Sequence, residues 1–162
     1  MNISARQLHS SAFVQEVVSA LEQSGAAPEK LVLELTESQL LQDIDTIIDK
    51  MQQLNTLGVR FSLDDFGTGY SSLSYLKLLP LKQLKIDRSF ITSLGVSSRD
   101  EPLVQAMINM ARGLGLKTVA EGIENEATAQ LLTRLGCDEG QGYYWSPAVP
   151  EDKLPALLRA RI

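Results

Sequence analysis

Five short apolar runs alternate with amphipathic segments along the chain, and this succession constrains the fold more than any other feature. The runs cover residues 31–37, 59–63, 83–87, 117–123 and 137–145. The connecting segments repeat apolar residues at helical spacing, and no hairpin turn is evident between the runs. Parallel strands joined by helical crossovers have this pattern. We therefore expect an α/β fold built on a parallel sheet, in a single domain over residues 1–162.

The expected helices follow from the same spacing. They cover residues 8–21 with a stop at Gly25, then 40–54, 72–79, 102–114, 127–135 and 151–159.

Polar residues stand at the C-terminal tip of every expected strand. In chain order they are Glu34, Asp64 and Asp65, Lys85 and Asp87, Glu121, and Gln141. In parallel α/β folds, functional sites form at the carboxyl ends of the strands. A solvated rim is the alternative interpretation, but a buried strand has no structural need for a charge at its tip. We therefore expect these side chains to share one site.

Asp64 and Asp65 open the stretch Asp-Asp-Phe-Gly-Thr-Gly-Tyr-Ser-Ser, which runs to Ser72. Adjacent strand residues point to opposite faces, so both carboxylates converge only at a strand end or a bulge. Two neighbouring anions repel unless a positive charge lies between them, and a hard divalent cation with oxygen ligands suits that position. Taken alone, the stretch could also be a polar turn. With the other strand-end residues, it predicts a metal site suited to hydrolysis of a phosphate ester.

Composition argues against several other classes of protein. The net charge is −5, from 15 basic and 20 acidic residues, without a basic block that would bind duplex nucleic acid. No apolar run is long enough to span a membrane, so we expect no membrane segment. The single cysteine, Cys137, rules out an internal disulfide and favours a reducing, cytoplasmic location.

Six motifs in the chain resemble the EAL domain, the bacterial family of cyclic di-GMP phosphodiesterases. They are Asn2-Ile3-Ser4, Glu34-Leu35-Thr36-Glu37-Ser38, the run from Asp64 to Ser72, Lys85-Ile86-Asp87-Arg88-Ser89-Phe90, Ala120-Glu121-Gly122-Ile123-Glu124 and Gln141-Gly142-Tyr143. The motifs occur in order and span almost the whole chain. The resemblance implies a (β/α)₈ TIM-barrel-type fold that hydrolyses one phosphodiester of cyclic di-GMP, giving the linear dinucleotide.

The resemblance also implies two divalent cations, Mg²⁺ or Mn²⁺. By this resemblance, Asn2, Glu34 and Asp64 would ligate one cation. Asp64 would bridge to the second cation, which Asp65 and Glu121 would also hold.

The catalytic assignments likewise rest on the resemblance. Lys85 would orient the attacking water, and Glu121 is a candidate general base. Gln141 would position a metal-bound water or the substrate, and Glu37 would brace the loop over residues 64–70.

Structural roles remain open for three of these residues. Lys85 could merely form a salt bridge with Asp64 or Asp87. Asp87 could support the site or cap the next turn, and we favour the cap slightly. Asn2 could cap the helix that follows it, because Asn is a preferred N-cap residue.

The chain departs from the family pattern at its start. It contains no Glu-Ala-Leu, the motif whose glutamate is a metal ligand on an early strand of the family barrel. Because Met1 directly precedes Asn2, we expect an incomplete barrel that lacks the first strands and helices, with a stub over residues 1–3.

Two expectations follow for this chain. Hydrolysis should be weak or absent, and the exposed strand edges should be covered in a homodimer or another edge-paired oligomer. A sensory or regulatory domain is expected in the parent protein. The alternative function is a degenerate EAL domain that binds cyclic di-GMP or a protein partner without turnover.

Overall fold

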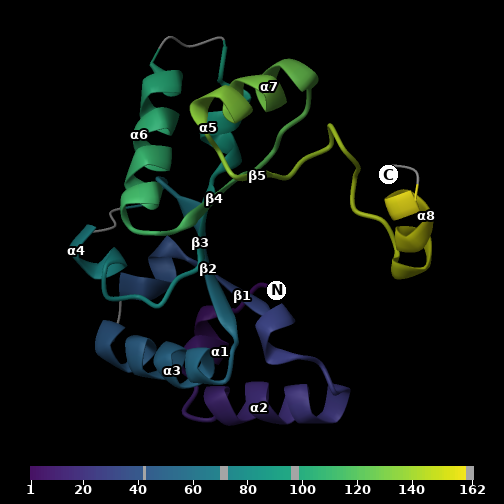
Figure 1. Ribbon diagram of the computed structural model, residues 1–162. Coiled ribbons are helices and arrows are strands. Elements are labelled where there is room, and N and C mark those ends of the chain that lie inside the picture. The colour runs from purple at the N-terminus through teal and green to yellow at the C-terminus, as the bar shows by residue number, and fades with distance from the viewer. Residues whose placement is uncertain (42, 70–72, 96–98, 160–162) are drawn as a thin grey trace.

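The computed structural model describes residues 1–41, 43–69, 73–95 and 99–159 (Figure 1). The α-helices are α1 (Ala5–His9), α2 (Phe13–Ser24), α3 (Ile44–Thr56), α4 (Leu73–Leu76), α5 (Arg88–Thr92), α6 (Asp100–Gly113), α7 (Glu126–Leu135) and α8 (Leu154–Arg159). The strands are β1 (Val32–Thr36), β2 (Arg60–Phe66), β3 (Gln83–Ile86), β4 (Lys117–Ala120) and β5 (Glu139–Gly140). Short 3₁₀ helices cover Pro28–Lys30 (η1), Glu37–Leu41 (η2) and Glu151–Lys153 (η3).

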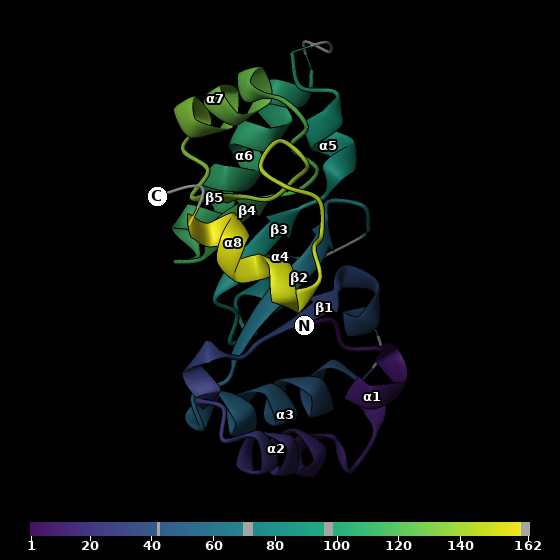
Figure 2. The ribbon, with the colours of Figure 1, turned by 90° about the vertical axis from the view of Figure 1, so that its right-hand side faces the viewer.

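The described strands form one sheet in the order β1-β2-β3-β4-β5, and every neighbouring pair is parallel. Figure 2 shows the strands side by side, with α5, α6 and α7 toward one end of the sheet and α2 and α3 toward the other. The expected parallel α/β sheet is therefore confirmed. The stub at residues 1–3 contributes a single parallel bridge between Asn2 and Glu34, beyond the outer edge of β1.

Successive side chains of the strands differ in burial. Those on one face pack into the core, and polar side chains of the expected site lie on the other face. Leu33 and Leu35 of β1 are almost completely buried, whereas Glu34 between them is only partly buried. Successive strand side chains point to opposite faces, so Glu34 lies on the face opposite these leucines. The core contains apolar side chains from the strands, α3 and α6, namely Leu33, Leu35, Phe61, Leu63, Leu84, Ile86, Ile47, Met51, Leu54, Val104, Met107 and Ile108.

The N-terminal helical segment is broken in two, whereas its spacing predicted one helix over residues 8–21. Ser4 and Gln7 form a capping box that begins α1, and the extended backbone of Ser10 ends it. Ser4, rather than Asn2, is thus the N-cap residue, and the alternative interpretation of Asn2 as a helix cap is wrong. Gly25, with φ +66°, ends α2 as predicted.

The chain leaves the sheet after β5 and ends in η3 and α8 rather than in one closing helix. Figure 1 places α8 apart from the other helices. Its side chains are exposed apart from that of Leu157. None of the described helices is both long and apolar enough to cross a membrane.

Candidate active site at the carboxyl ends of the strands

A bulge in β2 brings Asp64 and Asp65 together. Leu63 pairs with Leu84 of β3 and Phe66 pairs with Ile86, so two residues of β2 lie opposite one residue of β3. Asp65 has a φ of +54°, in the left-handed region, and its backbone N–H donates to Oδ1 of Asp64 over 3.1 Å. The extra residue breaks the alternation of the strand, as bulges do. Both carboxylates thereby reach the same side.

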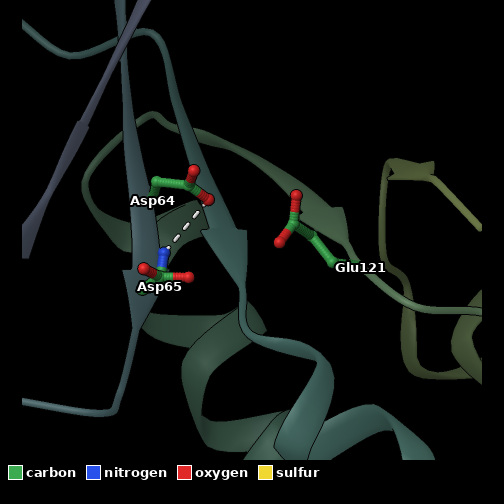
Figure 3. A group of neighbouring side chains, drawn as sticks. All are labelled: Asp64, Asp65 and Glu121. Carbon is green, nitrogen blue, oxygen red and sulfur yellow. Dashed lines mark hydrogen bonds between the residues drawn. The ribbon is translucent and has the colours of Figure 1, made fainter. Parts of the chain in front are cut away.

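Glu121 completes a group of three carboxylates. It follows β4, and its side chain points across the strand ends toward Asp64 and Asp65 (Figure 3). One carboxylate oxygen from each of the three lies within 4.8 Å of the others. An all-oxygen donor set of this size fits a hard divalent cation such as Mg²⁺, Mn²⁺ or Ca²⁺. The residues present therefore suit the metal that the sequence predicted.

Lys85 of β3 lies among these acidic side chains. Its Nζ is 2.6 Å from Oε1 of Glu121, 2.9 Å from Oε2 of Glu34 and 3.1 Å from Oδ1 of Asp64. The residue is only 4% exposed. Burial by itself lowers the pKa of Lys85, but hydrogen bonds to Glu121, Glu34 and Asp64 outweigh it and raise the pKa above its usual range. Lys85 therefore remains a cation, and its ion-pair partners include Asp64, as one interpretation proposed, together with two further carboxylates.

The carboxylates outnumber this one lysine. Burial raises the pKa of Glu121 above its usual value, and the hydrogen bond from Lys85 opposes the shift. Burial also raises the pKa of Asp65, and the neighbouring charge of Asp64 adds to it. Burial disfavours the charged form of both carboxyl groups, and the neighbouring carboxylates add to this effect. The site is thus able to accept additional positive charge.

The remaining predicted residues lie around this cluster. The bridge to Glu34 places Asn2 next to β1, held by the Ile3 N–H donating to the Glu34 carbonyl over 2.9 Å. Gln141 is exposed, and its backbone N–H donates to the Ala120 carbonyl over 2.8 Å, one residue before Glu121.

Asp87 is not one of the three grouped carboxylates, although its charge contributes to the raised pKa of Asp65. It is the N-cap of α5, where its Oδ1 accepts from the Ser89 backbone N–H over 3.0 Å. The favoured structural interpretation of Asp87 is therefore confirmed.

Glu37 lies beneath the loop that follows Asp65. It is 3% exposed, and its Oε2 accepts from the backbone N–H groups of Gly67 and Gly69, over 3.3 Å and 3.2 Å. A Cβ at Gly69 would stand 2.9 Å from Cδ of Glu37, so a larger residue there would require the Glu37 carboxylate to shift. Tyr70, at the end of the predicted loop, lies outside the described residues.

A cleft of about 500 Å³ adjoins the cluster, and the sequence did not single out all of its residues. Glu121 and Gln141 line it together with Arg88, Gly122 and Tyr143. Arg88 supplies a positive charge near the acidic group, and it occurs in the motif that begins at Lys85. Its position directly after the strand-end residue Asp87 was the available indication. Its closeness to Gly122, where an added Cβ would lie 2.6 Å from Cβ of Arg88, depends on the fold.

Residues 1–148 match the family model described as EAL domain. The chain belongs to the EAL domain family. Two curated proteins of Pseudomonas aeruginosa resemble it. The bifunctional diguanylate cyclase/cyclic di-GMP phosphodiesterase MucR is 46% identical over 158 residues, which is 98% of this chain and 23% of MucR. The cyclic di-GMP phosphodiesterase NbdA is 47% identical over 160 residues, which is 99% of this chain and 20% of NbdA. This EAL chain therefore spans about a fifth of each relative.

Solved structures agree with the assignment to the EAL family. The structure described as "PaMucR Phosphodiesterase, c-di-GMP complex" superposes with a TM-score of 0.90 at 46% identity, covering 94% of this chain and 62% of that one. A manganese and cyclic di-GMP complex of Klebsiella pneumoniae BlrP1 has a TM-score of 0.82 at 26% identity, covering 91% and 38%. The fold is thus of the TIM-barrel type, as predicted, with five strands in the part of the chain that the structure describes.

Proposed function

We propose that this EAL domain is the metal-dependent catalytic part of a phosphodiesterase that hydrolyses cyclic di-GMP to the linear dinucleotide. The observation that carries the proposal is the group formed by Asp64, Asp65 and Glu121 around Lys85 at the strand ends. It is supported by the names of MucR and NbdA and by the cyclic di-GMP in the complexes of two structural neighbours.

Two Mg²⁺ or Mn²⁺ ions are the proposed cofactors. Asp64, Asp65 and Glu121 would hold one, and Glu34 and Asn2 would join Asp64 in holding the other. When bound, two such ions clamp the attacking and leaving oxygens of an in-line displacement and make water nucleophilic near neutral pH. The excess of carboxylates over lysine supports this assignment, as does the manganese in the BlrP1 complex.

The side chains around the cations have separate roles in the proposal. Lys85 remains protonated and donates hydrogen bonds, so it orients the attacking water and offsets charge that develops on the phosphate. Glu121, whose pKa burial raises, accepts the proton from that water. Gln141 positions the substrate or a water beside Glu121.

The cleft beside Glu121 is the proposed binding place for part of the dinucleotide. Arg88 offers a cation for a phosphate or for the edge of a guanine, and Tyr143 offers an aromatic face for stacking. Because the whole chain carries a net charge of −5, local cations such as Arg88 must counter the repulsion of an anionic ligand.

We propose weak hydrolysis for the chain as given. The sequence has no Glu-Ala-Leu, so the glutamate that the family uses as a further metal ligand is not among these residues. The same observation favours the alternative function, a domain that binds cyclic di-GMP or a protein partner without turnover. The two functions differ in turnover, because only a phosphodiesterase forms the linear dinucleotide.

Self-association would cover the apolar surface beside β1. A groove there is lined mainly by apolar residues of α2, of the segment 26–31 and of β1, including Val17, Leu21, Leu31 and Leu33. We propose a homodimer or edge-paired oligomer, a cytoplasmic location, and a parent protein with a sensory or regulatory domain. The proposed sensory or regulatory domain is supported by the small share of MucR and NbdA that the chain spans. Sedimentation velocity would test the proposed self-association. A monomer at all protein concentrations would contradict it.

Equilibrium binding tests the assignment of the site. Cyclic di-GMP is titrated into the chain with Ca²⁺ and again after chelation of divalent cations. The proposal expects binding with Ca²⁺ and at least tenfold weaker binding without it. Asp64→Asn should abolish the cation dependence, whereas Asp49→Asn, an exposed aspartate of α3, should not change it. Binding that ignores both the cation and Asp64→Asn would contradict the proposed site.

A further inference from the structure

Asp138 and Thr118 form a closed ring of hydrogen bonds between neighbouring strands. Oδ2 of Asp138 accepts from the backbone N–H and from the hydroxyl of Thr118, both over 2.8 Å. In return, the backbone N–H of Asp138 donates to Oγ1 of Thr118 over 3.1 Å. Thr118 belongs to β4 and is 1% exposed, and Asp138 directly precedes β5. The ring therefore fixes the point at which β5 joins the sheet.

Strand β5 is short, and besides the ring it is held by the Lys117–Glu139 ion pair and by backbone hydrogen bonds of Gln141 to Ala120 and Ile123. It is two residues long, with Val119 paired to Glu139 and Ala120 paired to Gly140. A shift of one residue in a strand sends every later side chain to the opposite face. Gln141 follows β5 immediately, so its orientation depends on where this short strand begins.

The backbone of Gln141 is hydrogen-bonded to residues on both sides of Glu121. Its backbone N–H donates to the Ala120 carbonyl over 2.8 Å, and its carbonyl accepts from the Ile123 N–H over 3.1 Å. A Cβ at Gly140 would lie 2.7 Å from Cδ1 of Ile123, and a Cβ at Gly142 would collide with the Ile123 carbonyl oxygen. Gly142 thus allows a close contact with the Ile123 backbone, and Gly140 allows one with the side chains of Ile123 and Trp145.

We propose that Asp138 is a positioning residue for Gln141, acting through its ring with Thr118 and through the register of β5. The inference rests on the proposed function for the consequence in binding, but the positioning itself is a property of the fold. Asp138 lies three residues before Gln141, and the ring lies on the strand that leads to Glu121. The ring between Asp138 and Thr118 therefore sets the spacing between Gln141 and Glu121.

Hydrogen exchange of individual amides tests the positioning directly. In Asp138→Ala, the amides of Gln141 and Ile123 should exchange at least tenfold faster, because the bonds that protect them open locally. Amides of the β2–β3 pair, such as that of Lys85, should change less than twofold. Asp138→Asn should restore protection, because its amide oxygen can accept the same two hydrogen bonds.

Lys117→Ala is the matched control on the same strand pair. It removes the exposed ion pair between Lys117 and Glu139, 2.9 Å apart, without removing any hydrogen bond of the ring, and should leave the Gln141 amide protected. Unchanged exchange of Gln141 and Ile123 in Asp138→Ala would overturn the inference. Equal acceleration of all strand amides would also overturn it, because Asp138 would then act only on global stability.

A double-mutant cycle tests the consequence for the site. With Ca²⁺ present, Asp138→Ala should weaken cyclic di-GMP binding about fivefold in the unaltered chain and have little effect in Gln141→Ala, since coupled residues are not additive. Equal weakening in both backgrounds would contradict action through Gln141. If the unaltered chain does not bind cyclic di-GMP, the proposed function fails, while the exchange experiment still decides the positioning.

Discussion

Nζ of Lys85 lies 2.6 Å from Oε1 of Glu121, the shortest of the ion pairs that Lys85 makes with described residues. The two side chains come from β3 and from the residue after β4, so the contact exists only because these strands are parallel neighbours in register. It places a protonated amine against the carboxyl group that we propose as the proton acceptor. The consequences of this pair can be measured in the absence of any ligand.

Lys85→Met should destabilise the metal-free protein. The substitution keeps most of the side-chain length but leaves Glu34, Asp64 and Glu121 facing one another without a cation. Removing one partner of a buried ion pair costs about 3–5 kcal/mol. Because these carboxylates are partly exposed, we expect a loss of about 1–3 kcal/mol in the free energy of unfolding, measured by urea titration.

Added Mn²⁺ should recover part of that stability in Lys85→Met, because the cation replaces the lost positive charge. Lys117→Met is the control, since the ion pair of Lys117 is exposed, and the stability of this variant should barely change. A metal-free Lys85→Met as stable as the unaltered chain would refute the account of the cluster.

Glu37→Ala should weaken metal binding without a change in any metal ligand. The carboxylate of Glu37 accepts from the amides of Gly67 and Gly69, and the loop it holds begins beside Asp65. Loss of these bonds exposes the two amides and releases the backbone that orients the aspartate pair. We expect an increase of about tenfold in the dissociation constant of Mn²⁺, since outer contacts of metal ligands typically contribute 10–100-fold.

Calorimetric titration with Mn²⁺ measures this effect, and Glu29→Ala supplies a control at an exposed glutamate of η1. An unchanged dissociation constant in Glu37→Ala would show that the loop keeps its position without the carboxylate.

Gly142→Ala should disrupt the end of the sheet. The added Cβ would collide with the Ile123 carbonyl oxygen, and backbone atoms cannot yield as a flexible side chain can. We expect a loss of about 1–3 kcal/mol in unfolding free energy, the usual cost of overpacking, together with weaker cyclic di-GMP binding. Gly113→Ala is the matched control, because a Cβ added there, at the end of α6, would point into open space. Thermal unfolding of both variants measures the difference. Equal stability of Gly142→Ala and Gly113→Ala would contradict the close contact at Gly142.

The pKa of Asp138 should lie below its usual value of 3.8, because hydrogen bonds from the Thr118 backbone and hydroxyl favour the charged carboxylate. The unfolded chain then binds the proton more readily than the folded one. This contact therefore contributes stability above about pH 4, and that contribution is lost as the pH falls through the folded-state pKa.

Carboxyl chemical shifts followed by NMR would report the pKa of Asp138. Thr118→Val retains the backbone donor but removes the hydroxyl, so the pKa should move part of the way back toward 3.8. An Asp138 that titrates at or above 3.8 in the unaltered chain would argue against the ring.

The sequence predicted those features that depend on local pattern. Asp64 and Asp65 could be expected to converge because adjacent strand residues do so only at a bulge or strand end, and the structure shows a bulge. The parallel sheet followed from strand and helix periodicity. Asp87 could be interpreted as a cap because its neighbour Ser89 offers a nearby backbone N–H.

Individual contacts that depend on the register between distant strands could not be predicted, although the strand-end positions of Glu34, Lys85 and Glu121 did indicate one shared site. The partners of Lys85 include Glu34 and Glu121, 51 and 36 residues away, and only the pairing of β1 to β4 brings them together. The ring between Thr118 and Asp138 spans 20 residues for the same reason. The break between α1 and α2 was missed because the apolar spacing continues through residues 10–12, while the backbone of Ser10 turns extended.

The most direct test of the central claim is the conversion of cyclic di-GMP by the purified chain with Mn²⁺, followed by chromatography of the product. The account predicts slow formation of the linear dinucleotide that stops on chelation of the metal and is absent from Asp64→Ala. Asp49→Ala, at an exposed position of α3, should convert the substrate at the unaltered rate. Product that persists in Asp64→Ala would contradict the claim that this cluster is a metal-dependent phosphodiesterase site, and no product from the unaltered chain would favour the alternative function, binding without turnover.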